Sequence, residues 1–256
     1  MRKKISLAII MTIGMLSLLF VGCTKNNEEK TLTVSIAASL QKPMEKIATN
    51  FEKEYGVKIQ YNVGGSGTLK KQIDDGADVD LFFSANTKYA EELINEGLVN
   101  KGESYKILSN KLVLIENNDY NQKINSLEDL KSAEGKIAMG DVSTVPAGQY
   151  AKESLEKLGI FKDVESKLVF ARSVTSVKTY VENGEANLGF VYKTDALDLK
   201  NSKIVYEVPS DYHKPIEYEL CLLKNSKNSE EAKKFIDYLE NSESKKIFSE
   251  YGFGVN

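Results

Sequence analysis

Apolar residues follow two alternating spacings along the chain after residue 30. Short apolar runs predict strands, and after each run apolar residues recur every three or four positions, which predicts a helix. The strands predicted in the first unit are 31–38, 57–63 and 79–85. The helices predicted to follow them are 39–56, 68–76 and 86–97. The apolar face of the first helix carries Leu40, Met44, Ile47, Ala48 and Phe51. Such a series is typical of an α/β fold with a parallel, doubly wound sheet.

The second half of the chain repeats this style. Its predicted strands are 136–141, 167–172, 186–192, 203–209 and 216–224. Its predicted helices are 147–159, 174–184 and a long terminal helix over 229–252. Apolar residues at helical spacing in the terminal helix, which predict packing against a sheet, are Ala232, Phe235, Ile236 and Leu239.

Two apolar segments, 109–116 and 218–223, flank the second unit. A chain that leaves the first unit, builds the second and returns to the first needs two crossing strands of this kind. We therefore expect a discontinuous domain I, formed by residues 31–112 and 217–256, and a domain II formed by residues 113–216. No long Pro/Gly-rich linker separates the units, which favours a continuous hinge.

The composition is that of an ordinary globular protein, with 41% hydrophobic and 28% charged residues. The net charge of -3 and the lack of a basic stripe interleaved with aromatic residues argue against a nucleic-acid partner. Any affinity for an anion must be local, because the overall field of the protein is mildly negative.

The first 22 residues form an export signal, with a positive start, an apolar run and a small residue before Cys23. The ending "FVGC" resembles a bacterial lipobox, although Phe20 replaces the usual leucine. We expect cleavage at Cys23, lipidation of that cysteine and a short linker over 23–30. An uncleaved transmembrane anchor is the alternative, and both would hold the protein at the outer face of the cell membrane.

The sequence contains few cysteine and histidine residues that could bind a metal ion or act as a nucleophile. Cys221 lies in the apolar run "YELCLL", and His213, the single histidine, lies in a polar turn. One histidine with no neighbouring cysteine excludes an ordinary zinc site and argues against imidazole catalysis. We expect Cys221 to be a small buried side chain, His213 to lie at the surface, and the protein to be neither an enzyme nor dependent on a cofactor.

The strand-to-helix turns hold the candidate chemistry, because ligands of open α/β sheets bind beyond the carboxyl ends of the strands. The turns are "AASL", "GGSGT", "GDVSTVPAGQY", "ARSVTSV" and "VYKTDA". They are rich in Ser, Thr and Gly and poor in cations; Asp141, Asp195 and Arg172 are the charged residues that stand out. Each turn also has a plain structural interpretation, in which serine caps a helix and Pro146 begins one.

Several donor-rich turns at one sheet edge suit a fully ionised oxyanion, which needs donors only. Lys70 and Lys71 come after the turn "GGSGT", inside the predicted helix, so this is no nucleotide-binding P-loop. Helix N-termini supply partial positive charge without an ammonium group.

Several of these motifs together resemble the molybdate-binding proteins of ABC transporters, over roughly residues 31–253. The motifs are "AASL", "GSGTLKKQIDDGADVDLFFSAN", "GDVSTVPAGQYAKESLEKLG", "GFVYKTDA" and "IFSEYGF". The resemblance implies a two-domain periplasmic binding fold of type II with a hinged ligand cleft. It also implies a monomer that passes molybdate, and often tungstate, to a membrane permease.

The resemblance also implies a ligand shell of five residues. Ser39 and Ser66 would donate hydroxyl and backbone N–H groups, Ala147 and Val174 would donate backbone N–H groups, and Tyr192 would donate its phenolic hydroxyl. The segment around Val174 matches the family weakly, which leaves its register open by one residue.

Other functions are compatible with the same cleft. A receptor for sulfate, phosphate or another small oxyanion would use the same kind of donors. A secreted phosphoester hydrolase would need a cluster of His, Cys and carboxylate residues or a serine–base pair, which the sequence lacks. A sensory receptor domain would need a separate signalling partner.

Overall fold

The computed structural model describes residues 30–255. The predicted signal peptide and Cys23 lie outside these residues. Within the described part of the chain, no helix combines the length and the apolar character that crossing a membrane requires.

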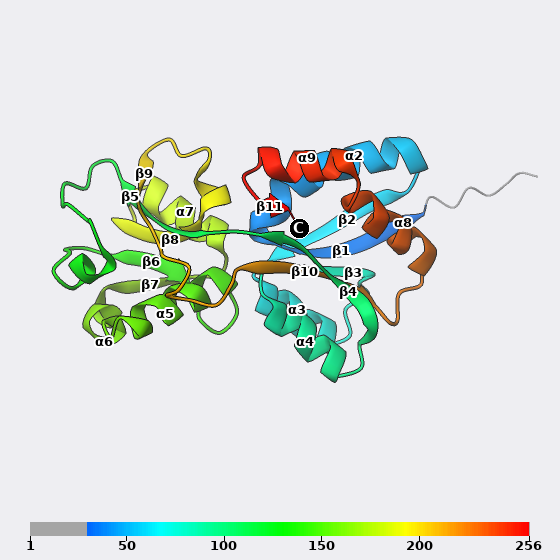
Figure 1. Cartoon of the computed structure of the whole chain (residues 1–256), viewed down its shortest axis with the longest axis horizontal. Coiled ribbons are helices and arrows are strands. Elements are labelled where there is room, and N and C mark those ends of the chain that lie inside the picture. Colours follow the sequence, from blue (N-terminus) through cyan, green and yellow to red (C-terminus); the bar gives the residue numbers. More distant parts are fainter. Residues whose placement is uncertain (1–29, 256) are drawn as a thin grey trace, which may run out of the picture. The chain divides into compact units, whose positions relative to one another are not determined.

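Strands and helices alternate as the hydrophobic pattern predicts (Figure 1). The strands are β1 (Thr31–Ala37), β2 (Lys58–Gly64), β3 (Leu81–Ser84), β4 (Val99–Ser109), β5 (Leu112–Asn117), β6 (Ile137–Gly140), β7 (Leu168–Ala171), β8 (Leu188–Tyr192), β9 (Ser202–Glu207), β10 (Glu217–Leu223) and β11 (Gly254–Val255). The α-helices are α2 (Gln41–Tyr55), α3 (Ser66–Asp74), α4 (Thr87–Asn95), α5 (Pro146–Lys157), α6 (Phe161–Val164), α7 (Val174–Glu182), α8 (Ser229–Leu239) and α9 (Ser242–Glu250). Short 3-10 helices are η1 (Ala38–Leu40), η2 (Leu127–Lys131), η3 (Glu165–Lys167) and η4 (Lys193–Ala196).

The strands form two sheets, with the orders β11-β4-β10-β3-β1-β2 and β7-β6-β8-β5-β9. The pairs β1–β2, β1–β3, β6–β7 and β6–β8 are parallel, as predicted. Strand β10 pairs antiparallel with β3 and β4, and β5 pairs antiparallel with β8 and β9. The parallel arrangement was thus predicted correctly, and the antiparallel pairs of β10 and β5 are additional to it. Strands β5 and β10 follow the two passages of the chain between the sheets. They run antiparallel to their neighbours because each enters its sheet from the other one.

We call each sheet with its covering helices a lobe. The first lobe contains β1–β4, β10 and β11; helices α2, α8 and α9 cover one face of its sheet, and α3 and α4 cover the other (Figure 1). The second lobe contains β5–β9 with α5, α6 and α7 (Figure 1). The chain passes between the sheets after β4 and before β10. The whole segment from Thr31 on packs as one compact unit, and its division into two hinged domains stays a prediction.

The structure tests two predictions about the core, the apolar face of α2 and the single terminal helix. The apolar face predicted for α2 is buried along its whole length, from Leu40 to Phe51. The single helix predicted over 229–252 was wrong, because Asn241 interrupts it with extended backbone and its side chain accepts a hydrogen bond from Ser244 N–H. An N-cap of this kind begins a new helix, which is α9.

Candidate oxyanion-binding site

A small cavity, of about 200 Å³ when the open solvent at its mouth is included, lies where the carboxyl ends of strands from both sheets meet. The first lobe contributes Ala37, Ala38, Ser39, Gly64, Gly65, Ser66 and Ala85 to its lining. The second lobe contributes Val145, Pro146, Ala147, Val174 and Tyr192. The structure thus brings together all five residues of the predicted ligand shell, although they span 154 positions of sequence (192 − 39 + 1). Their contact with an oxyanion stays a prediction.

Three helices begin at this cavity. Ser66 is the first residue of α3, Ala147 is the second residue of α5 after Pro146, and Val174 is the first residue of α7. The backbone N–H groups of a first helical turn have no acceptor inside their helix. These N–H groups and the positive ends of three helix dipoles therefore suit an anion.

Helix α3 begins at Ser66, two residues earlier than the sequence pattern predicted. Gly65 precedes it with extended backbone (φ -68°, ψ 135°) and acts as the N-cap residue. The Ser66 side chain is fully buried, and its Oγ accepts a hydrogen bond from the backbone N–H of Ala85 at 3.1 Å. An oxygen that accepts this bond keeps its own proton free to donate.

The glycines of "GGSGT" serve the close approach of the two lobes. A Cβ atom on Gly67 would lie 2.7 Å from Cα of Thr144, and one on Gly65 would lie 3.0 Å from the Thr144 carbonyl oxygen. The Gly67 N–H donates to that same Thr144 oxygen at 2.8 Å. Glycine is required here because the backbone of one lobe packs directly on the backbone of the other.

Ser39 lies in the 3-10 helix η1, between β1 and α2, and not at an α-helix N-cap. Its Oγ is 2.8 Å from the hydroxyl of Tyr218, a fully buried residue of β10. Local sequence patterns do not indicate this contact, because the two residues are far apart in the chain.

Tyr192 ends strand β8 and is 1% exposed. Its hydroxyl is buried and has no hydrogen-bond partner among the described residues. Burial raises the pKa of Tyr192 well above its ordinary value, so the phenol stays protonated and able to donate. An unpaired buried donor is costly, and an anion in the cavity would supply the missing acceptor.

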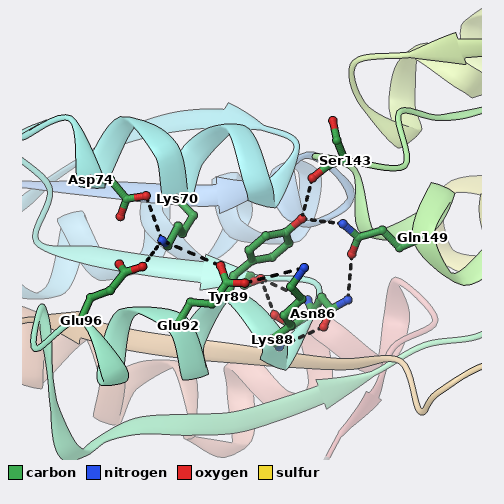
Figure 2. Close-up of polar contacts among 10 residues, drawn as sticks. Lys70, Asp74, Asn86, Lys88, Tyr89, Glu92, Glu96, Ser143 and Gln149 are labelled. Carbon is green, nitrogen blue, oxygen red and sulfur yellow. Dashed lines mark hydrogen bonds and ion pairs between the residues drawn. The ribbon is translucent and has the colours of Figure 1, made fainter.

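The cavity lining contains no Lys, Arg, His, Asp or Glu among the described residues. Lys70, one turn into α3, points away from the cavity to Asp74 and Glu96, at 2.9 Å and 2.5 Å (Figure 2). Lys71 is exposed. The helix that begins at the cavity therefore carries its ammonium groups elsewhere.

The other charged turn residues do not line the cavity. Arg172 is exposed, and the Asp141 carboxylate accepts bonds from the backbone N–H and the hydroxyl of Ser143. Asp195 lies in η4 beside the cavity with its Oδ2 buried and unpartnered within residues 30–255. Burial raises the pKa of Asp195 to about 7.

Polar contacts join the two lobes at the rim of the cavity (Figure 2). The Tyr89 hydroxyl donates to the Ser143 carbonyl at 3.3 Å and accepts from Gln149 Nε2 at 2.6 Å. Asn86 Nδ2 donates to Gln149 Oε1 at 3.0 Å. Lys42 of α2 forms an ion pair with Asp198 of the second lobe. These contacts were not predicted, since polar side chains at the surface give no local signal of a partner.

The expectations for the two remaining candidate residues have different outcomes. Cys221 is buried, and burial raises the pKa of its thiol to about 12, which confirms a small inert side chain. His213 is half-buried, with its ring 5.6 Å from that of Tyr150, so it is less exposed than the polar turn predicted.

Comparison with known proteins places the chain among solute receptors. Residues 32–254 match the family of bacterial extracellular solute-binding proteins. The chain is 43% identical over 243 residues to a putative ABC transporter substrate-binding lipoprotein of Bacillus subtilis, covering 92% of this chain and 93% of the relative. It is 38% identical over 233 residues to the molybdate-binding protein ModA of Escherichia coli, covering 89% and 90%.

A solved structure agrees with these relatives. The substrate-binding domain of a putative molybdenum ABC transporter from Clostridium difficile superimposes with a TM-score of 0.67 and 38% identity, covering 88% of this chain and 98% of that one. The fold is that of the type II periplasmic binding proteins, and the predicted resemblance is confirmed. The chain belongs to the family of bacterial extracellular solute-binding proteins.

Proposed function

We propose that this protein is the substrate-binding component of an ABC importer, which binds molybdate, and also tungstate, between its two lobes and delivers it to a membrane permease. One observation carries the proposal above the others: donors from both lobes line a single small cavity, and among its lining residues is Tyr192, whose hydroxyl has no partner within residues 30–255. The molybdate-binding relative and the molybdenum-transporter structure support the same ligand.

The character of the donors favours a dianion that carries no proton. The proposed shell is formed by the hydroxyls of Ser39, Ser66 and Tyr192 and by the backbone N–H groups at Ser39, Ser66, Ala147 and Val174. None of these groups carries a charge, so each hydrogen bond to the dianion is charge-assisted on the ligand side only. Such bonds are worth about 1.5–3 kcal/mol each.

Molybdate and sulfate have the same charge and tetrahedral shape, so the size of the cavity must distinguish them. Bonds from molybdenum or tungsten to oxygen are longer than those from sulfur. A shell fixed by three helix N-termini and two strand ends would hold the larger anion at full hydrogen-bonding distance and leave gaps around sulfate. We propose this radius as the basis of selectivity.

We further propose that the protein acts as a monomer, without a cofactor or enzymatic activity, and is held at the outer face of the membrane by lipid on Cys23. The name of the Bacillus subtilis relative, a lipoprotein, supports the anchor. Intact-mass measurement of the membrane-extracted protein would test it: a diacylglyceryl mass on a chain that begins at Cys23 is expected, and a chain that retains residues 1–22 would contradict it.

Calorimetric titration tests the ligand. The full chain, purified in detergent and dialysed free of oxyanions, is titrated with molybdate, tungstate, sulfate and phosphate. One-to-one binding of the two larger anions, with sulfate far weaker, is the expected result. Tighter binding of sulfate or phosphate would keep the cavity and overturn the ligand, and no heat from any of the four would overturn the proposed function.

A further inference from the structure

Ser39 differs from Ser66 in what fixes the direction of its hydroxyl. At Ser66 a backbone N–H, that of Ala85, donates to Oγ, and a backbone N–H can only donate. At Ser39 the partner is the Tyr218 hydroxyl, and either oxygen of that pair could be the donor. The donor character of Ser39 therefore depends on what else Tyr218 contacts.

The side-chain amide of Asn110 settles the direction. Asn110 lies between β4 and β5, where the chain first crosses between the sheets, and its Oδ1 accepts a hydrogen bond from Lys111 N–H at 2.8 Å. This bond fixes which end of the amide is oxygen. The opposite atom, Nδ2, lies 2.9 Å from Thr194 Oγ1 and 3.1 Å from the Tyr218 hydroxyl oxygen.

An amide nitrogen has two hydrogens and no acceptor capacity, so Thr194 and Tyr218 must both accept from Asn110. Burial raises the pKa of Tyr218 well above its ordinary value, so the phenol keeps its single proton. That proton is directed to the other partner of the phenol oxygen, Ser39 Oγ. Ser39 in turn has its own proton left for the cavity that it lines.

We infer that Asn110 and Tyr218 are positioning residues that force Ser39 to act as a hydrogen-bond donor, and that this relay makes the site reject oxyanions that carry a proton. The inference rests on the proposed function and deepens it. A protonated oxyanion such as hydrogen phosphate needs one acceptor in its shell. With Ser39 and Ser66 both directed as donors, the Tyr192 oxygen is the one hydroxyl acceptor left in the proposed shell, so the site disfavours a ligand that carries a proton.

Asn110→Asp reverses the relay with almost no change of shape. The carboxylate still accepts from Lys111 N–H, and its second oxygen replaces Nδ2 with an acceptor. Tyr218 then donates to residue 110 and accepts from Ser39, which turns the Ser39 lone pairs toward the cavity. The relay thus predicts weaker binding of molybdate and sulfate and a gain for hydrogen phosphate relative to both.

The ratio of affinities is the readout that separates the relay from other effects. At mildly alkaline pH molybdate, sulfate and hydrogen phosphate all carry two negative charges, so repulsion by a new carboxylate weakens the three alike. A general structural defect also weakens the three alike. A change in the ratio of molybdate or sulfate to hydrogen phosphate reports the exchange of a donor for an acceptor.

The experiment titrates the full chain in detergent with the three anions, for the parent protein, Asn110→Asp, Tyr218→Phe and the double variant. We expect Asn110→Asp to reduce the ratio of molybdate affinity, or sulfate affinity, to hydrogen phosphate affinity by about 10-fold or more. Tyr218→Phe cuts the relay, so adding Asn110→Asp to it should change the ratio no further. Thr194→Val is the control, because it removes the other acceptor of the same amide and leaves the link to Ser39 intact; its ratio should equal that of the parent.

The outcomes separate the relay from the proposed function. An unchanged ratio in Asn110→Asp, or an equal change in Thr194→Val, would overturn the relay while the parent still binds molybdate. If Asn110→Asp does not fold, Tyr218→Phe alone decides, since an unchanged ratio there contradicts the relay. A parent that prefers sulfate would overturn molybdate as the ligand, yet its ratio of sulfate to phosphate would still test the relay. A parent that binds none of the three, or prefers phosphate, would overturn both.

Discussion

The start of helix α3 and its middle, one turn later, differ in how they present positive charge. At its start, Ser66 lines the cavity with an uncharged hydroxyl, and its backbone N–H belongs to a first helical turn, which offers no acceptor inside the helix. One turn later, the Lys70 ammonium group is largely buried and bound by Asp74 and Glu96 (Figure 2). The start of the helix, which faces the proposed anion, thus has uncharged donors. The charge of Lys70 is neutralised by Asp74 and Glu96.

This difference indicates what the site selects. A lysine in the cavity would attract any anion, since an ammonium group is a strongly hydrated point charge on a flexible stem. Fixed peptide dipoles and directed hydroxyls distinguish anions by shape and by proton, because each donor has one direction. A lysine in the cavity would therefore add affinity for every anion without adding selectivity.

The largest loss of binding is expected from a substitution at Ser66, the first residue of α3. Ser66→Ala removes a hydroxyl donor and leaves the Ala85 N–H without its acceptor, so molybdate affinity should fall on the order of 10- to 100-fold. Calorimetry of the variant measures this. Ser154→Ala is the matched control, because Ser154 is also a buried serine but bonds only to the Tyr150 carbonyl within α5. Equal affinities for Ser66→Ala and the parent would remove Ser66 from the shell.

Gly67→Ala tests whether the lobes must meet for the donors to act together. The new methyl group would lie 2.7 Å from Thr144 Cα in the other lobe, while alanine suits helix α3 itself. We expect affinity to fall about 10-fold, because overpacking of this kind costs about 1–3 kcal/mol. Solution scattering should show a larger radius of gyration with molybdate present than for the parent, and an identical profile would contradict the contact between lobes.

Tyr192→Phe should weaken binding about 10-fold without loss of stability. The hydroxyl has no partner among the described residues, so the fold loses no hydrogen bond and sheds a buried polar group. Thermal unfolding without oxyanion should therefore show an unchanged or higher midpoint. Tyr120→Phe is the contrast, because the Tyr120 hydroxyl contacts Gln122 and the Glu134 carbonyl, so its removal should lower the midpoint and spare binding.

Lys70→Met removes the buried ammonium group in the middle of α3. If Lys70 contributes nothing to the cavity, molybdate affinity should stay within about 2-fold of the parent, while the free energy of unfolding falls by about 1 kcal/mol through the loss of its partners. Lys71→Met, at an exposed neighbour, should change neither quantity. A large loss of binding in Lys70→Met alone would mean that the charge reaches the anion after all.

The last prediction concerns stability against pH and not anion binding. Burial raises the pKa of Asp195 to about 7, so between its ordinary value and that pKa the folded state holds a proton that the unfolded state has lost. This group therefore makes the protein less stable as pH rises through that window, and its contribution is constant above it. Asp195→Asn should flatten this part of the curve of stability against pH, and an unaltered slope would contradict it.

The five cavity residues could be predicted because strand ends and helix starts leave a local signature of Ser, Gly and Pro, which the motif resemblance then assigns. The residues that orient the Ser39 hydroxyl could not be predicted. Tyr218 and Asn110 direct Ser39 from 179 and 71 positions away, and nothing in their local sequence indicates a partner. Strand β4 was missed because its first half, from Asn100 to Lys106, is polar and exposed or half-buried, without an apolar period. The break between α8 and α9 had a signal in Asn241 that the apolar spacing outweighed.

The walls of the cavity come from both lobes, and this has a kinetic consequence for the proposed receptor. In a receptor with hinged lobes such an anion would leave when the lobes part, so its residence time would depend on how often the rim opens as well as on the donors inside. The rim contacts are those of Tyr89 and Gln149 on one side and the ion pair of Lys42 with Asp198 on the other. A permease that unloads the receptor would need to compete for those contacts, and the shell that selects the anion could remain untouched.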